Sequence, residues 1–317
     1  MSLSKTDKYI LEELKKLVRI YNDALFESKH PRDSIGRFAK HRVSSSYTEL
    51  LENVNKNNKI TYTSDQIIAN FVKNNPQYSE SEIRQKIHEI DEYNKVIADN
   101  NLETYKIYSN EKGEYKRERL EEHKKILNEI FANKEKAKPS ANEKPVFMVL
   151  GGRGGSGKSK FNGRVYDESK YIVLDADKIK EKLPQYHGYN AYEVHEESSN
   201  ILTSALAKAK KEGLNVVLDG TMKTLKSVED KIKLFQDAGY DIQMYYMHLP
   251  REKAAERAIG RFLGKSGRYV PLNYILNKMK ENENNFDKLK HYASKWAIYS
   301  NDVPSEKDEP ILIDKNY

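Results

Sequence analysis

The sequence predicts an α/β fold, in which a parallel sheet flanked by helices follows an all-helical N-terminal region. Three observations lead to this prediction. After Pro145, short runs rich in β-branched and aromatic residues alternate with helical periods. Before residue 110, apolar residues recur three and four positions apart. A glycine-rich segment comes directly after the first predicted strand. Strand–helix alternation is typical of parallel sheets covered by helices.

The first part of the chain, residues 1–110, is predicted to contain helices joined by polar loops. One helix is expected at residues 8–26, where apolar residues line one face. A second is expected at 79–98, because Ser79 is followed three residues later by Glu82, as in a capping box. A basic connection broken by Gly and Pro separates them at 29–46. The apolar content is thin, so this region is expected to pack on the second half or on a partner.

The second part, residues 111–317, begins with an expected helix at 113–134 and a linker to Pro145. Ligands of such folds bind at the carboxyl ends of the parallel strands, so a site is expected there. The predicted strands are 146–150, 171–175, 215–219, 242–249 and 310–313. One predicted helix begins at Lys158, and three others span residues 197–213, 226–239 and 250–264.

Composition limits the functional class. The chain has 317 residues, no cysteine and a net charge of +7, and 38% of it is apolar. Disulfides and thiolate metal sites are therefore excluded, and no apolar run approaches the roughly 18–20 residues of a membrane span. Residues 1–110 hold 17 Lys/Arg against 16 Asp/Glu, and residues 111–317 hold 38 against 32. This modest excess argues against a basic stripe that binds nucleic acid. From the lack of cysteine and of a long apolar run, we expect a cytoplasmic protein.

The glycine-rich segment matches the pattern G-x-x-x-x-G-K-[ST] in full. In such a loop, backbone N–H groups and the start of a following helix face nucleotide phosphates. Lys158 is expected to neutralise the β/γ-phosphates of ATP, and the Ser159 hydroxyl to hold Mg²⁺. The predicted nucleotide-binding residues are Gly152, Arg153, Gly154, Gly155, Ser156, Gly157, Lys158 and Ser159.

Acidic residues close the next two predicted strands. Asp175 and Asp177 follow one of them, and in extended chain residues two apart point the same way. Either could orient and deprotonate an acceptor hydroxyl, or cap the next helix. Asp219, followed by Gly220 and Thr221, closes another strand and could serve Mg²⁺ or a substrate.

Three arginines follow the last long predicted strand. Arg257 and Arg261 share one helix face, and Arg268 comes after a loop containing Gly264 and Gly267. Such a segment can close over a bound nucleotide. The planar guanidinium spreads charge over a transferring phosphoryl group, although a surface helix rich in arginine is the plain alternative.

Residues 112–317 resemble the zeta toxin family, which are P-loop kinases of toxin–antitoxin systems. The resemblance rests on "GGRGGSGKS", "VLDADKIKEKLPQY", "HEESSNILTSALAKA", "GLNVVLDGTM" and "AIGRFLGKSGRYVP", in the family's order. It implies a kinase that uses ATP and Mg²⁺ to phosphorylate the 3′-hydroxyl of UDP-N-acetylglucosamine. It also implies a helical antitoxin partner.

When the roles of the family's residues are carried over by position, Asp177 would be the general base. Arg261 and Arg268 would stabilise the transferring phosphoryl group. Lys158 and Ser159 would hold ATP and Mg²⁺. The same resemblance places Asp219 and Thr221 at the sugar-nucleotide, with Asp219 also a metal candidate. Asp219 stands where the founding toxins have glutamate, so the acceptor stays open: a nucleotide, a nucleic-acid end or an antibiotic are alternatives. A nucleotide-binding structural protein is a further alternative.

Two segments have no assigned role from the sequence. Tyr186, Tyr189 and Tyr192 lie between the acids and the next helix, where they either stack on a substrate or pack locally, and His195 contacts substrate or begins that helix. Residues 1–110 are a candidate cis-inhibitory module, a delivery or localisation module, or a stabilising extension. Within them, residues 30–41 are similar to short segments of phage structural proteins.

Overall fold

The computed structural model describes residues 45–305 and 308–317. The helix expected at 8–26, and nearly all of the basic connection at 29–46, lie outside the described residues. Among the helices of the described residues, none combines the length and the apolar character of a membrane span.

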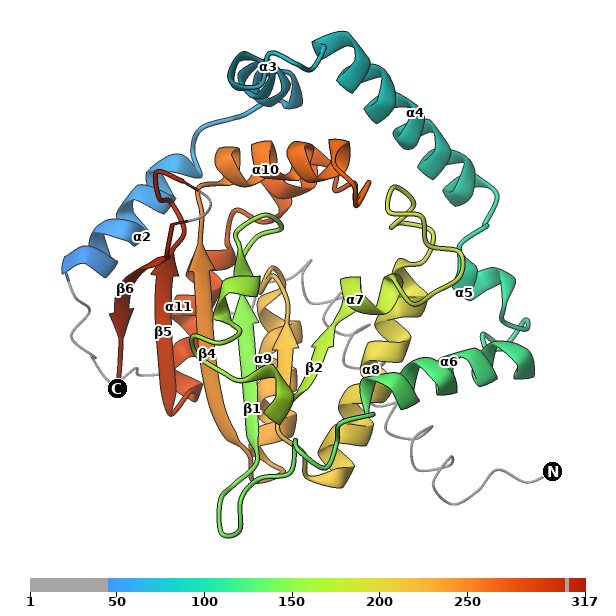
Figure 1. The fold of residues 1–317 in the computed structure, drawn as a ribbon, viewed down its shortest axis with the longest axis vertical. Helices are drawn as coiled ribbons and strands as arrows, with labels where there is room; N and C mark the ends of the chain where they lie inside the picture. The colour runs from blue at the N-terminus through green and yellow to red at the C-terminus, as the bar shows by residue number, and fades with distance from the viewer. Residues whose placement is uncertain (1–44, 306–307) are drawn as a thin grey trace.

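A six-stranded sheet forms the centre of the molecule, in the order β2-β3-β1-β4-β5-β6 (Figure 1). The strands are β1 (Val146–Gly151), β2 (Ile172–Asp175), β3 (Val216–Asp219), β4 (Asp241–His248), β5 (Lys295–Ser300) and β6 (Ile311–Lys315). Strands β1 to β5 are parallel and β6 is antiparallel to β5. The α/β prediction is confirmed, with one strand added and one reversed.

The added and the reversed strand lie at the same edge of the sheet. Strand β5 was not predicted from the sequence, and residues 310–313 were assigned to the parallel sheet, whereas β6 pairs antiparallel with β5. Only residues 301–310 separate the two strands. A parallel connection needs a crossover of roughly a dozen residues or more, so this short connection favours the antiparallel pairing.

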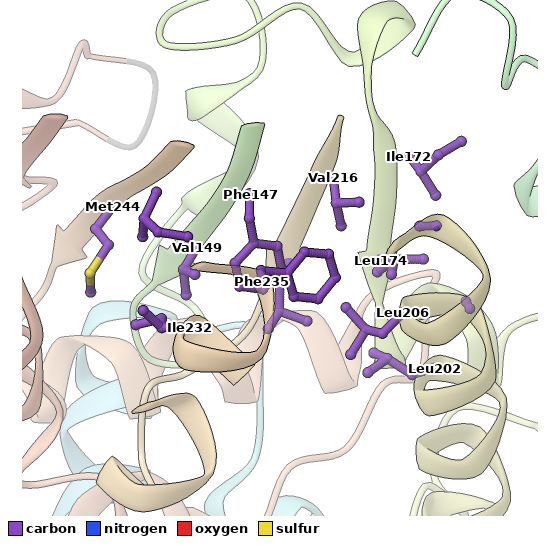
Figure 2. Packing of buried hydrophobic residues seen from close by; sticks show 14 of the residues in the cluster. Phe147, Val149, Ile172, Leu174, Leu202, Leu206, Val216, Ile232, Phe235 and Met244 are labelled. Atoms are coloured by element: carbon purple, nitrogen blue, oxygen red, sulfur yellow. The ribbon is translucent and has the colours of Figure 1, made fainter. Parts of the chain in front are cut away.

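Helices cover one face of the sheet: α8 (His195–Glu212), α9 (Leu225–Gln236) and α11 (Asn282–Leu289). Figure 2 shows Phe147 of β1 against Phe235 of α9, with Leu202 and Leu206 of α8 beside Leu174. The rings of Phe147 and Phe235 are stacked with centroids 3.9 Å apart. Every second residue of β1 faces this layer, as expected for a strand.

The opposite face is covered by an irregular segment instead of the helix expected from Lys158. The chain forms only the short 3₁₀ helix η1 (Lys158–Phe161), and Phe161 packs on Tyr245 and Tyr299. The turn at Asn162 and Gly163 ends it, because Gly163 has φ 77° and the N–H of Arg164 returns to the Phe161 carbonyl at 3.0 Å. The prediction of a helix beginning at Lys158 is therefore met only by this one short 3₁₀ helix.

Residues 45–110, here called the arm, run around the top of the molecule in Figure 1. Their helices are α2 (Ser45–Asn57), α3 (Ser64–Asn74), α4 (Glu80–Asp99) and α5 (Thr104–Ile107). The Ser79 side chain caps α4 by accepting from the N–H of Glu82, which is one half of the expected capping box. Ile67 and Phe71 of α3 share a hydrophobic cluster with α10 (Arg251–Leu263), so the arm packs on the second half of the chain.

A buried ion-pair network attaches α6 (Arg117–Ile130) to α8. The Arg119 guanidinium donates to both carboxylate oxygens of Glu197, from Nε and, at 2.8 Å, from Nη2, and His123 Nε2 lies 2.6 Å from Glu197 Oε1. Burial would raise the pKa of Glu197, but the bonds to Arg119 and His123 outweigh it and lower that pKa to about 2.

Candidate active site

The phosphate loop follows β1 at the carboxyl ends of the parallel strands. It packs closely against α10 on one side and against Asn301 on the other. Gly155 has φ 91° and Gly157 has φ 87°. A Cβ at Gly155 would lie 2.8 Å from the carbonyl oxygen of Ala254, and one at Gly157 would lie 2.3 Å from Asn301 Nδ2. Glycine is favoured at Gly155 by both the backbone angle and the Ala254 carbonyl, and at Gly157 by the backbone angle.

The phosphate loop carries the ammonium group of Lys158 and the hydroxyl of Ser156. Lys158 Nζ donates to the carbonyl of Gly152 at 2.9 Å and lies 3.6 Å from Asp219 Oδ1. The Ser156 hydroxyl is buried and makes no hydrogen bond within the described residues. The side chain of Ser159 is exposed at the start of η1. The loop therefore has a cation and hydroxyls suited to a phosphate chain.

Arg153, also part of the phosphate loop, turns its side chain into the protein. Its guanidinium pairs with both oxygens of Glu283 in α11, and His248 Nδ1 lies 2.9 Å from the same carboxylate. Burial would raise the pKa of Glu283, but Arg153 and His248 outweigh it and lower the pKa to about 2. Only the backbone of Arg153 remains for a phosphate, and its side chain anchors the loop.

Asp175 and Asp177 are in different local structures. Asp175 ends β2 and caps α7 (Ala176–Lys180), because its Oδ1 accepts from the N–H of Asp177 at 2.8 Å. Asp177 lies in the first turn of that helix, so the expectation of two acids side by side in extended chain was wrong. Asp177 instead pairs with Lys180 at 3.0 Å and with Arg268. Burial would raise the pKa of Asp177, but Lys180, Arg268 and Lys158 outweigh it and lower the pKa.

Asp219 lies opposite Asp175 in the pairing of β2 with β3. Burial and the negative charges of Asp175 and Asp177 raise the pKa of Asp219 to about 6, against the opposing charge of Lys158. In residues 45–305 and 308–317, no three or more His, Cys, Asp or Glu side chains are arranged to hold a metal ion.

The turn after Asp219 is held by two asparagines of α11. Asn282 donates to the carbonyl of Thr221 at 2.6 Å, and Asn285 donates to the carbonyls of Met222 and Lys223 at 2.9 Å. Met222 has φ 56°, a strained angle for a side chain of this size. These bonds hold the backbone of residues 221–223 in place. Neither asparagine was predicted from the sequence, since "ENENNF" carries no motif.

The three arginines lie along the same rim of the site. The Arg261 Nη2 atom is 3.8 Å from where a Cβ of Gly154 would be, so this side chain lies beside the phosphate loop. Arg257 Nη2 donates to the carbonyl of Asn301 at 3.4 Å. Arg268 reaches Asp177 from residues 264–270, here called the lid loop. The structure thus brings Arg261 to the phosphate loop and Arg268 to the acid.

Residues 184–194, here called the tyrosine loop, connect α7 to α8. Tyr189 packs edge-on against Tyr93 of the arm at 5.6 Å, and the Tyr192 hydroxyl is 3.4 Å from Glu103. Tyr186 packs on the main hydrophobic cluster. These contacts fit the local-packing alternative. His195 is the first residue of α8, and its carbonyl accepts from the hydroxyls of Ser198 and Ser199.

Comparisons with known proteins show the family of the chain. The family model described as zeta toxin matches residues 128–313, more than half of the chain. Toxin zeta of Streptococcus pyogenes is 29% identical over 140 residues, or 41% of this chain and 46% of that protein. Toxin PezT of Streptococcus pneumoniae is 22% identical over 113 residues, covering 33% and 45%. The matches thus span less than half the length of these curated relatives.

A solved structure described as AvrRxo1-ORF1:-ORF2 with ATP has the same fold. Its TM-score is 0.52 at 14% identity, over 63% of this chain and 68% of that chain. The family model gives the family, and the solved structure gives the fold. The chain belongs to the zeta toxin family and has the fold of a P-loop kinase.

Proposed function

We propose that the protein is an ATP-dependent kinase that phosphorylates a hydroxyl of a sugar-nucleotide, with UDP-N-acetylglucosamine as the acceptor. The observation that carries the proposal is the meeting of Lys158, Asp177, Asp219 and Arg268 at one edge of the sheet. These four side chains come from four separate segments. A cation for the donor, an acid for the acceptor and an arginine for the transferring group are what phosphoryl transfer requires.

In this mechanism the acceptor oxygen attacks the γ-phosphorus of ATP and the bond to the β-phosphate oxygen breaks, so ADP leaves. The proton of the acceptor hydroxyl passes to Asp177. Lys158 neutralises the phosphate oxygens of the donor, and Arg261 and Arg268 stabilise the charge of the transferring group. Both oxygens of Asp177 are engaged by cations in the structure. Arg268 therefore moves from Asp177 to the phosphate before the proton is accepted.

Ser159 and Asp219 are the residues proposed to hold Mg²⁺. Magnesium in nucleotide sites takes one or two protein oxygens and completes its shell with phosphate and water, so two donors are sufficient. When bound, the ion would neutralise charge on the phosphates. A metal ligand must be ionised, so Mg²⁺ would bind Asp219 in its carboxylate form, against the rise in its pKa that burial and the neighbouring acids cause.

Control of this activity by a separate antitoxin protein, or by residues 1–110, is part of the proposal. Relatives of the chain carry the name toxin. The hydrogen bonds that join the arm to Asp287, Glu252, Lys280, Glu193, Arg251 and Tyr269 all end outside residues 152–159. Obstruction of the phosphate loop by residues 45–110 therefore has no support from these contacts.

The test is mass spectrometry of reactions containing ATP, Mg²⁺ and a panel of acceptors: UDP-N-acetylglucosamine, other nucleotide sugars, nucleosides, nucleic-acid ends and aminoglycosides. Among these acceptors, we expect an added phosphate on UDP-N-acetylglucosamine alone. Asp177→Asn should lower transfer at least about 100-fold while ATP still binds. Asp237→Asn, an exposed acid at the end of α9, is the matched control. Full transfer by Asp177→Asn would refute its role as base.

Two other outcomes identify the alternatives. Phosphate on a different acceptor would keep the enzyme class and replace the substrate. ATP binding with no acceptor-dependent ADP formation across the panel would favour a nucleotide-binding structural protein.

A further inference from the structure

The lid loop, which carries the Arg268 partner of Asp177, touches the tyrosine loop, and these two loops together are here called the roof. The N–H of Tyr269, in the lid loop, donates to the carbonyl of Gly188, in the tyrosine loop, at 3.4 Å. A Cβ at Gly188 would lie 2.7 Å from the Ser266 carbonyl, and Gly188 has φ 84°. The two backbones therefore touch, and only glycine permits this approach.

Helix α4 of the arm contacts both loops. Asp91 Oδ1 accepts from the Tyr269 hydroxyl at 3.2 Å, which ties α4 to the lid loop. The Tyr93 hydroxyl donates to Glu193 Oε2 at 2.6 Å, which ties α4 to the tyrosine loop. Residues two apart in an α-helix point about 200° from each other, so neighbouring positions of α4 can reach opposite sides.

Both ends of α4 are fixed to the rest of the protein. At its start, Ile83 shares the hydrophobic cluster of α3 and α10. Beyond its end, the N–H of Thr104 donates to the carbonyl of Glu193 at 2.9 Å. Helix α4 thus spans from the arginine helix α10 to the tyrosine loop, as Figure 1 shows along the upper right of the molecule. A helix held at both ends can fix the position of the loops that it contacts.

The contact at Tyr269 bears directly on the site. Tyr269 is buried and follows Arg268, whose guanidinium lies on Asp177. Fixing Tyr269 therefore fixes the base of the neighbouring Arg268 side chain. The path runs from Asp91 through Tyr269 and Arg268 to Asp177, while Tyr93 holds the other half of the roof.

We propose that Asp91 and Tyr93 are positioning residues, which keep the roof closed over Asp177 so that the acceptor hydroxyl, and not water, receives the phosphoryl group. This inference rests on the proposed kinase function. It concerns residues outside the family match at 128–313, so it describes what the arm adds to the zeta toxin segment. Closing a kinase site against water suppresses hydrolysis of ATP.

The experiment compares Asp91→Ala, Tyr93→Phe and the double variant with the wild type in the full chain. Tyr78→Phe is the matched control, because Tyr78 also lies in the arm but packs on Phe71, outside the roof. Phosphorylated acceptor and ADP are measured together. In the double variant we expect the ratio of the two to fall about three- to ten-fold, the loss of one or two hydrogen bonds. The KM for the acceptor should rise and the KM for ATP should not change.

An unchanged ratio in the double variant would overturn the inference. If the double variant formed both more phosphorylated acceptor and more ADP than the wild type, the inference would also be overturned. The arm would then restrain the enzyme instead of positioning the loops. Hydrogen exchange of the free protein gives a second readout that needs no acceptor. Peptides covering 184–194 and 264–270 should exchange faster in the double variant than in Tyr78→Phe.

The two readouts separate this inference from the proposed function. If the wild type modifies no acceptor, the proposed kinase function fails, and exchange alone decides whether the arm holds the roof. Unchanged hydrogen exchange of residues 184–194 and 264–270 in the double variant would then refute the idea that Asp91 and Tyr93 hold these loops. Faster exchange would support it.

Discussion

Replacing Glu283 with glutamine tests the anchor of the phosphate loop. Glu283 is fully buried and pairs with Arg153 and His248. In Glu283→Gln the guanidinium of Arg153 stays buried without a counter-charge. Removing one partner of a buried ion pair typically costs about 3–5 kcal/mol. We therefore expect a large loss of stability together with a displaced loop.

The pKa of Glu283 gives an independent magnitude. It falls from 4.5 to about 2 in the folded protein, and at 1.36 kcal/mol per pKa unit this corresponds to about 3 kcal/mol. The sign follows from the lowered pKa: this stability is present above pH 4.5 and is lost as the pH falls toward 2. The two routes together give about 3–5 kcal/mol at pH 7, or roughly 5–7 °C in Tm for a chain of this size, at about 2.1 cal/mol/K of unfolding entropy per residue.

The assay is urea unfolding of wild type and Glu283→Gln between pH 3 and 7. The difference in unfolding free energy should be largest at pH 7 and shrink below pH 4.5. Glu121→Gln is the control, since Glu121 is exposed and pairs with Lys124 at the surface, and this variant should unfold with the wild type. A difference below about 0.5 kcal/mol for Glu283→Gln at pH 7 would refute the anchoring role.

Two further substitutions test the loop and the acid beside it. Gly155→Ala should lower the unfolding free energy by roughly 1–3 kcal/mol and raise the KM for ATP. Gly213→Ala has a similar φ but open space around its Cβ, so it should strain the chain without changing that KM. Equal KM values in the two variants would contradict a tight loop. Asp219→Asn should gain stability relative to the wild type as the pH rises from about 4 to 7.5. The reason is that a carboxyl whose pKa is raised in the folded state destabilises that state once ionised. A stability difference that does not vary with pH would contradict the raised pKa.

The parts of the site that the sequence predicted lie where local patterns determine the structure. The phosphate loop and Asp219 follow buried strands directly, and the carboxyl ends of parallel strands meet at one edge. The two asparagines of α11, together with Glu283 and Asn301, act through contacts far along the chain. No spacing or periodicity near them indicates which carbonyl or guanidinium they will contact.

The errors in the fold have similar physical causes. The run after Lys158 has residues that tolerate a helix, but the Asn-Gly turn ended it after one turn. Strand β5 closely follows the helices α11 and η4 (Lys290–Tyr292), so its apolar run had no turn signal before it. The role of Asp175 depended on whether residue 176 begins a helix, which the motif does not determine.

The packing of α2 has a consequence for how the chain is made. The Tyr47 hydroxyl donates to Asp287 Oδ1 at 3.1 Å, and its ring lies 6.1 Å from that of Trp296, so residues about 240 positions apart are in contact. Such long-range contacts close late and slow folding. A ribosome releases α2 long before its partners exist. Completion of this hydrophobic core therefore waits until nearly the whole chain has been synthesised.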